Sequence, residues 1–403
     1  MFALYGADAK DEPYIGRTPN LRGRLERLLQ PSPKHPKRLQ LAGRVRRIAW
    51  RLTGSEFESL LAQFSLLEGM HGAKALERMH LKAPAFVRYL GSNAYPRIVV
   101  TNRPSQREAD WVYGPFASRG AAERFAEEAL KLFLLRRCTD DLHPDPSFPG
   151  CIYSEMKMCL APCFKGCTDE RYADEAAAVE DFLATRGASR LVVLKEQREE
   201  ASARLEFETA AAIHAQVQKV ESVQALAPEL VRPMNRLRTA ILQTAANPDE
   251  VAVFLFDAGR LRGPVGFSTI GMRIQNEQSG STSLFAQPMA LEPVPEENAA
   301  ENDASGNRVL RAERKAVRTM LEARMEAVLT ELEKGDEPAS TTVRQGHLAL
   351  LKRWYYRPEA KRPGEIFFLT DDGNWPLKAL LRGVGRVAAK TLAEQPGANG
   401  SSL

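Results

Sequence analysis

The chain has 403 residues, of which 44% are hydrophobic and 27% are charged, and its formal net charge is +5. This length predicts two or three domains that each bury a core, and the composition is typical of globular proteins. No run approaches roughly 18 apolar residues, and the start MFALYGADAKDEP lacks the regions of a signal peptide. We therefore expect no membrane anchor and a cytoplasmic location, where thiols stay reduced.

Positive charge is concentrated near the N-terminus. Between Arg17 and Arg51 there are eleven Lys or Arg residues and one acid, Glu26, which gives this stretch a net charge of +10. Such a concentration attracts a phosphate backbone, although a solvated basic face is the alternative interpretation. The residues expected to contact DNA are Arg22, Arg24, Arg27, Lys37 and Arg38.

The first part of the chain alternates between short strands and helices. ALYGADAKDEPYIG predicts strand, turn and strand over residues 3–16. Leucines at helical spacing predict a helix over 20–30, with Asn20 as its N-cap. The capping-box pattern SEFE begins a second predicted helix at 55–68, and YPRIVVT is expected to be a strand.

The rest of the chain is expected to be largely helical, with one pair of strands. The sequence between the last predicted strands and the final helix, 286–306, is rich in Pro, Ala and acidic residues and is expected to be a flexible segment. The fold class that these elements predict is multi-domain α+β. The expected helices are 118–136, 169–186 and 307–334, the expected helical hairpin is 190–224, and the expected strand pair is 251–268.

All five cysteines lie within residues 138–167. Their spacing is Cys138-x12-Cys151-x7-Cys159-x3-Cys163, with Cys167 four residues further on. Four converging thiolates in a reducing compartment suit a tetrahedral zinc site or an iron–sulfur cluster. A zinc ribbon usually has two short cysteine pairs, and here there is one. The alternative is that these residues are small buried side chains in a helical layer.

Residues 191–223 predict two antiparallel helices with apolar or small residues on one face and charged residues on the other. Leu205 and Phe207 lie near the junction of the two helices. A short hairpin cannot bury its apolar stripe alone, so we expect a partner surface there. Packing onto the chain's own core is the alternative.

The segment RRCTDDLHPDPSFPGCIYSEMKMCLAPC resembles the cysteine region of the UvrC family of excinuclease proteins. Neighbouring segments resemble the family in the same order: YIGRTPNLRGRL, YPRIVVT, YGPFAS and LEFETAA. Weaker similarity continues to LLKRWYYRPEAKRPGEIFF, so that the resemblance covers most of the chain. It implies a nucleotide-excision-repair protein that binds DNA and a UvrB-like partner.

The resemblance also implies an organisation and a cofactor. A [4Fe–4S] cluster is expected on Cys138, Cys151, Cys159 and Cys163, with zinc as the alternative metal, and Cys167 has no family counterpart. The UVR motif implies UvrB contacts through Leu205, Phe207, Ala210 and Ala211. The implied domains are a GIY-YIG nuclease-like domain with a small mixed sheet (1–112), a helical cysteine-cluster region (113–188), a UVR-like hairpin (189–225) and a C-terminal α+β region (226–403).

Resemblance to the GIY-YIG fold assigns the nuclease residues. Tyr14 matches the second family tyrosine, Arg17 stands where the family has a lysine, and Arg24 matches the arginine. Phe2 replaces the first tyrosine. Gln63 falls where the family has the glutamate that holds Mg²⁺, and an amide lacks the anionic charge of that carboxylate.

Two functions therefore remain open. One is a UvrC-like or Cho-like DNA endonuclease that lacks the RNase H-like nuclease half of the family. The other is a non-catalytic homologue that binds DNA and UvrB as an accessory module. The Gln63 substitution predicts DNA binding with slow incision or none.

Overall fold

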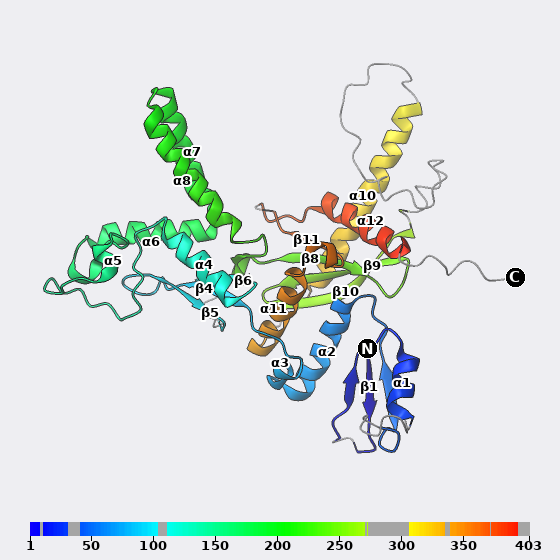
Figure 1. The fold of residues 1–403 in the computed structure, drawn as a ribbon. Coiled ribbons are helices and arrows are strands. Elements are labelled where there is room, and N and C mark those ends of the chain that lie inside the picture. The colour runs from blue at the N-terminus through cyan, green and yellow to red at the C-terminus, as the bar shows by residue number, and fades with distance from the viewer. Residues whose placement is uncertain are drawn as a thin grey trace.

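The computed structural model describes residues 1–8, 11–30, 41–103, 111–270, 272, 306–334, 339–370 and 372–393. Over these ranges the chain forms three antiparallel sheets with helices packed around them, which confirms the expected α+β class (Figure 1). Within the same ranges, every helix is too short or too polar to cross a bilayer. Lys37, Arg38 and nearly all of the acidic segment 286–306 lie outside the described residues.

The N-terminal unit is a three-stranded sheet of order β2-β1-β3 with one helix over it. Both pairings are antiparallel, so the expected mixed sheet is wrong. The predicted helix is confirmed, because the Asn20 side chain accepts the Gly23 N–H at 2.8 Å and so caps it. Phe2, Leu4 and Leu28 form a small core between helix and sheet. The elements are β1 (Phe2–Tyr5), β2 (Tyr14–Gly16), α1 (Leu21–Leu29) and β3 (Arg47–Trp50).

The middle unit is built on a second sheet, of order β5-β4-β6-β7. Helices α4 and α6 cover it, and the aromatic pairs Phe116–Phe125 and Phe133–Phe182 fill the interface. The expected helix at 118–136 ends earlier than predicted, at Leu130. The elements are β4 (Ala85–Tyr89), β5 (Ile98–Thr101), β6 (Val112–Phe116), α4 (Arg119–Leu130), α5 (Ile152–Glu155), α6 (Asp169–Ala184) and β7 (Arg232–Pro233).

The predicted helical hairpin is confirmed as α7 (Ala188–Ala203) and α8 (Phe207–Ala225). Figure 1 shows the pair projecting from the rest of the molecule. Its two helices pack through a short apolar seam, and its base joins the core of the middle unit. The buried residues of the pair are Leu194, Ala201, Val217, Val220 and Val223.

The C-terminal unit is a third sheet, of order β10-β9-β8-β11, that is covered on both faces. Alternation along β9 places Phe254 and Phe256 in the core shared with α2 and α11, and Val253 and Leu255 in the core shared with α10 and α12. The predicted strand pair and the helix at 307–334 are confirmed. The elements are α2 (Glu56–His71), α3 (Lys74–Arg78), β8 (Thr239–Thr244), β9 (Glu250–Asp257), β10 (Arg260–Ser268), α10 (Gly306–Glu333), α11 (Thr341–Tyr355), β11 (Glu365–Phe368) and α12 (Leu377–Ala393).

Helix α2 packs with the C-terminal unit, although it lies between the first two sheets in sequence. The Phe57 ring lies 5.2 Å from Phe254 and 5.6 Å from Trp354, between ring centroids. Phe64 is 1% exposed and meets the His347 ring at 5.4 Å. The predicted domain boundary at residue 112 also falls inside β6, and β6 pairs with β4, so that boundary divides one sheet.

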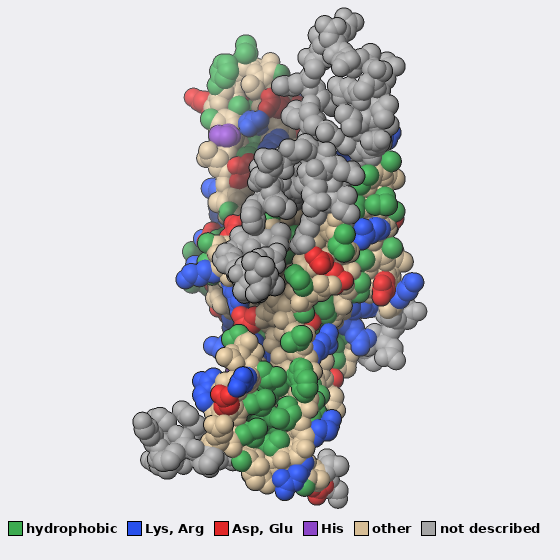
Figure 2. Space-filling view, turned by 90° about the vertical axis from the view of Figure 1, so that its right-hand side faces the viewer, with side chains coloured by type: hydrophobic (Ala, Val, Ile, Leu, Met, Phe, Trp, Pro, Cys, Tyr) green, Lys and Arg blue, Asp and Glu red, His purple; other side chains and the backbone are tan. Residues whose placement is uncertain are grey.

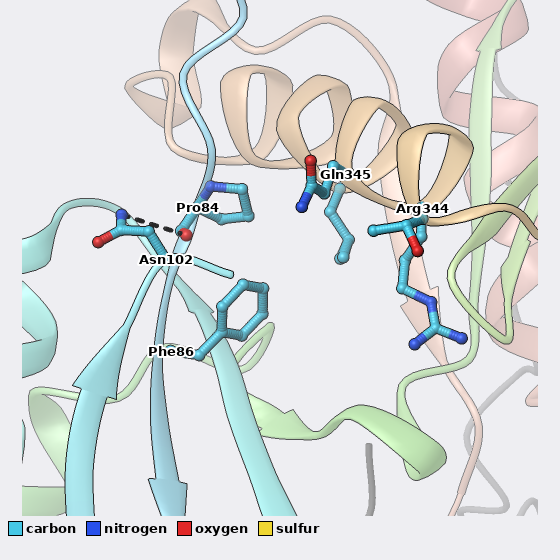
Figure 3. A pocket seen from close by; sticks show the side chains of 7 residues that line it. Pro84, Phe86, Asn102, Arg344 and Gln345 are labelled. Atoms are coloured by element: carbon cyan, nitrogen blue, oxygen red, sulfur yellow. Dashed lines mark hydrogen bonds between the residues drawn. The ribbon is translucent and has the colours of Figure 1, made fainter. Parts of the chain in front are cut away.

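The middle and C-terminal units meet where α11 passes sheet residues 84–102. Figure 3 shows Pro84 and Gln345 facing one another there, with Asn102 donating to the Pro84 carbonyl at 3.4 Å. The hollow between them holds about 10 Å³, room for no more than one water molecule. This seam is therefore a packing contact and not a ligand site.

Candidate functional site

Tyr14 and Arg24 are brought together by the N-terminal sheet and helix. Asn20 starts α1 directly after β2, so Arg24 projects from the first turns of the helix toward the strand. An Arg24 guanidinium N–H donates to the Tyr14 hydroxyl oxygen at 2.7 Å. The arrangement places a phenol and a permanent positive charge side by side, and both groups can contact the oxygens of a phosphodiester.

Arg17 is joined instead to Glu56, the first residue of α2, at 3.7 Å. Arg357, just beyond α11, binds the other oxygen of the same carboxylate at 2.9 Å. Burial alone would raise the pKa of Glu56, but the hydrogen bond and charge of Arg357, together with Arg17, lower it. Burial lowers the pKa of Arg17. Arg17, Glu56 and Arg357 therefore form an ionic bridge from the N-terminal unit to the C-terminal unit.

The carboxylate of Glu58, two residues further along α2, is also engaged by other protein groups. Glu58 is 5% exposed, accepts the Gly54 N–H at 2.9 Å and lies 3.6 Å from Arg51. Ser55 accepts the Glu58 N–H at 3.1 Å, so the predicted cap is present, but the Glu58 side chain binds Gly54 in place of Ser55.

Gln63 is not joined to these residues. It lies seven positions after Glu56, about 10 Å further along α2. In the described part of the chain, no hydrogen bond or ion pair links Gln63 to Tyr14, Arg17 or Arg24. Among the described residues, the structure thus joins Tyr14 and Arg24 by a hydrogen bond and joins Gln63 to neither of them.

Three of the predicted DNA-contacting arginines, Arg22, Arg24 and Arg27, lie on α1. Arg22 and Arg27 are exposed; Arg22 donates to Glu26 at 3.2 Å and Arg27 to the Gly23 carbonyl at 2.9 Å. Arg24 is half-buried against Tyr14. The Arg22 and Arg27 guanidinium groups are therefore accessible to solvent on α1, and the Arg24 guanidinium is held against the tyrosine.

The cysteine segment is a chain of tight turns between α4 and α6. Cys151 precedes α5, Cys163 lies in the short helix Pro162–Phe164, and all five thiols are half-buried. The backbone is left-handed at Lys157, Ala161 and Lys165, with φ of 54°, 57° and 58°. Such strained non-glycine residues gather at functional sites.

Two donors point at sulfur atoms in this segment. The Ala161 N–H lies 3.3 Å from the Cys159 Sγ, and an Arg136 guanidinium nitrogen lies 3.5 Å from the Cys138 Sγ. The Asp145 N–H donates to the Cys163 carbonyl at 2.9 Å, which ties the loop that follows Cys138 to the turn of Cys163. N–H groups directed at sulfur stabilise thiolates.

The thiols of Cys138, Cys151, Cys159 and Cys163 act on one another. Burial raises the pKa of Cys159 to about 11, and the charges of the other three cysteines add to this rise. Burial and Cys151 raise the pKa of Cys163 as well. The Cys159 thiol is therefore within electrostatic reach of the other three, whereas Cys167 packs against the core of the middle unit.

The chemical type of these ligands suits a soft metal centre, because the segment offers four thiols and N–H groups are directed at two of them. The thiols are not drawn together into a closed set: among the described residues, no three His, Cys, Asp or Glu side chains form a group that could hold a metal ion. The fit is therefore one of donor chemistry alone.

The hairpin tip exposes its apolar residues. Leu205 is 71% exposed and Phe207 is 66% exposed, with Leu205 held in the left-handed region at φ 61°. Ala211 is exposed one turn further along α8, and Ala210 is half-buried. Three of the four predicted partner-binding residues are therefore exposed at or near the tip of the hairpin.

Sequence reasoning missed two features of this region. The ionic bridge of Glu56 cannot be read from spacing, because Arg357 lies 301 positions away. Trp50 is 64% exposed at the end of β3. The signal for it was present, since RRIAWRL places an aromatic residue among arginines.

Similarity to known proteins is centred on the middle of the chain. Residues 86–182 match the family model of the UvrC/Cho excinuclease middle domain. UvrABC system protein C of Alcanivorax borkumensis is 30% identical over 211 residues, which are 52% of this chain and 34% of that protein. The protein of the same name from Carboxydothermus hydrogenoformans is 26% identical over 269 residues, 66% of this chain and 44% of that protein.

A third relative of that name, from a Ruegeria species, is 28% identical over 212 residues. The matched segments span between about a third and less than half of the relatives' own length. No solved structure matches the chain. The matched family model and these relatives support a relationship to the UvrC family that is carried by the middle of the chain and extends over about half of it.

Proposed function

We propose that this chain is a UvrC-like nucleotide-excision-repair protein that binds DNA and a UvrB-like partner, with a GIY-YIG-type domain whose hydrolytic site is incomplete. The observation that carries the proposal is the match of residues 86–182 to the UvrC/Cho middle domain. The features on either side of this match, the Tyr14–Arg24 pair and the α7–α8 hairpin, are those expected of the same family.

DNA binding is supported by the charge of the N-terminal unit. Arg22 and Arg27 are exposed on α1, and the stretch that contains them carries one acid among eleven cations. Each cation that neutralises a phosphate releases a counterion, so affinity should fall steeply with salt.

Partner binding is supported by the hairpin tip. Phe207 and Leu205 are exposed at the end of two projecting helices, where the chain itself covers neither side chain (Figure 1). An aromatic residue at the centre of a small apolar surface is a typical anchor of a protein interface. The proposed partner is UvrB.

For the cysteines, we propose a [4Fe–4S] cluster, with zinc as the alternative, held by Cys138, Cys151, Cys159 and Cys163. Either centre cross-links the segment and adds its binding energy to folding. The N–H groups of Ala161 and Arg136 then stabilise the thiolates of Cys159 and Cys138.

For the nuclease site, Tyr14 and Arg24 are the residues that would contact a phosphodiester. Arg24 orients the Tyr14 hydroxyl and supplies positive charge for the transition state. A divalent ion such as Mg²⁺ offsets charge on the phosphate and on the leaving oxygen. Glu56 and Glu58 are engaged with arginines, and Gln63 is uncharged, so none of these three positions offers a free carboxylate to the pair.

The second candidate is an accessory module that binds DNA and UvrB without cutting. The ion pairs of Glu56 and Glu58 with arginines favour it, because they leave neither carboxylate free. Both candidates predict binding, and they differ in incision.

Binding is tested by titrating labelled duplex DNA with the full chain at several salt concentrations, with and without UvrB. We expect a linear fall of log affinity with log salt, and a shallower slope for Arg22→Gln with Arg27→Gln. Absence of DNA binding, or of any complex with UvrB, would contradict the proposal.

A further inference from the structure

The N-terminal unit carries an uncovered apolar face. A shallow hollow of about 610 Å³ lies along α1 and the edge strand β3. Figure 2 shows hydrophobic side chains gathered on this unit, with Lys and Arg side chains around them. The apolar residues that line the hollow are Leu21, Leu25, Leu29, Ile48 and Trp50.

Strand register explains why Trp50 is left uncovered. Trp50 lies opposite Phe2, which in turn lies opposite Gly16, so these three residues form one row across the sheet. Phe2 is 1% exposed, whereas Trp50, on the outer strand, is 64% exposed. Leu52, just past the strand, is 77% exposed. The indole is therefore presented to solvent on a rigid strand.

The charges around this indole are positive. Arg46 is exposed directly before the strand, and Arg22 lines the hollow together with Trp50. Arg47 alternates to the other face of the sheet, where it stacks on the Tyr5 ring at 3.9 Å, and Arg51 lies 3.6 Å from Glu58. On α1, Arg22 is exposed and paired with Glu26, the single acid between Arg17 and Arg51. The occupant that this surface fits is therefore anionic and has flat apolar faces.

Single-stranded nucleic acid has that chemistry. Its unpaired bases stack on exposed aromatic side chains, and its phosphates bind the flanking arginines. A duplex hides the faces of its bases, so it offers phosphates alone. An acidic protein segment would satisfy the arginines as well, and it is one of the outcomes that the test below distinguishes.

We propose that Trp50 is a stacking platform for a base of single-stranded nucleic acid, with the exposed Arg22 and Arg46 holding the flanking phosphates. The inference rests on the proposed DNA-binding function and deepens it, because it names the strand state and the residue that recognises it. Tyr14 and Ile48 flank Leu4 in the row next to that of Trp50, so Trp50 and Tyr14 belong to the same face of the sheet, about 12 Å apart, with α1 packed on Phe2 and Leu4 between them.

The test compares oligothymidine with a duplex of matched length, both fluorescein-labelled, by anisotropy with the full chain. Trp50→Ala should weaken binding of the single strand by roughly 5- to 150-fold and affect the duplex much less. Trp50→Phe should keep most of the affinity, because a phenyl ring still stacks. Val193→Ala, at a side chain that is 44% exposed on the hairpin, is the matched control and should change nothing.

Thermal unfolding of each variant checks that it folds. If Trp50→Ala does not fold, the affinity of Trp50→Phe for the single strand still tests the inference. Equal single-strand affinity of wild type and the Trp50 variants, with duplex binding intact, would overturn this inference and leave the proposed function standing. Loss of UvrB association in Trp50→Ala with unchanged DNA affinity would assign the face to a protein and overturn it too. If the wild-type protein binds neither the single strand nor the duplex, both this inference and the proposed function are overturned.

Discussion

Protonation of His347 should set the acid stability of the C-terminal unit. His347 is 5% exposed on α11, and its Nδ1 accepts the Leu261 N–H of β10 at 2.9 Å. Burial lowers the pKa of His347 to about 4, and the charge of Arg260 contributes to this fall from the ordinary value of 6.5. Between these two values the unfolded chain binds the proton and the folded chain does not. Stability must therefore fall as pH falls from 6.5 to 4.

The size of the effect follows from the gap between the two pKa values. Each unit is worth about 1.4 kcal/mol, so full protonation should cost about 3 kcal/mol of unfolding free energy. Urea unfolding of wild type and His347→Gln, at pH above 6.5 and near 4, measures it. Gln can still accept from Leu261 but does not titrate. Wild type should lose about 3 kcal/mol more than the variant, and parallel losses would refute the reasoning.

Three further changes test separate parts of the molecule. Phe64→Ala should lower the unfolding free energy by about 3–5 kcal/mol in urea, because the ring is buried between α2 and α11; a loss below about 1 kcal/mol would contradict that packing. Cys159→Ser should release metal and lower the melting temperature, whereas Cys167→Ser should retain the metal; elemental analysis of anaerobically purified protein should find about four irons in wild type, and one zinc without iron would reject the cluster. Phe207→Asp should abolish capture of UvrB with no change in melting temperature, while Val193→Asp on the same hairpin should not; unchanged capture by Phe207→Asp would exclude the tip.

Local signals in the sequence predicted local structure well. Asn20 and Ser55 cap the helices that they were expected to begin, because capping needs only an oxygen and an N–H three residues on. The hairpin was predictable for a similar reason, since helical periodicity and the break at residues 204–206 both lie within it. The strand pair β9–β10 follows from its turn at Asp257–Gly259.

Long-range packing was not predictable in this way. Helix α2 is apolar on much of its surface, with Phe57, Leu60, Leu61, Phe64 and Leu67 all buried, and such a helix can cover either neighbouring sheet. Its choice of the C-terminal sheet depends on Phe254 and Trp354, which lie far along the chain. The boundary at residue 112 was misplaced because of that choice and because β6 pairs back onto β4.

In the candidate site, too, local contacts were predictable from the sequence and long-range contacts were not. Tyr14 and Arg24 are ten positions apart and meet as the family resemblance implies, whereas the partners of Glu56 come from distant parts of the chain. The sequence spacing identified the four cysteines that are proposed to hold a metal, but the path of their segment depends on turns with left-handed residues, which spacing does not encode.

The central claim is that this chain binds DNA and UvrB but has an incomplete hydrolytic site. The most direct test is an incision assay on a lesion-bearing duplex, with UvrB and Mg²⁺, in which binding and strand cleavage are read from the same samples. Wild type should bind the duplex and cut it slowly or not at all, and Gln63→Glu should raise Mg²⁺-dependent cleavage. Robust incision by wild type that is lost in Tyr14→Phe or Arg24→Ala would contradict the account.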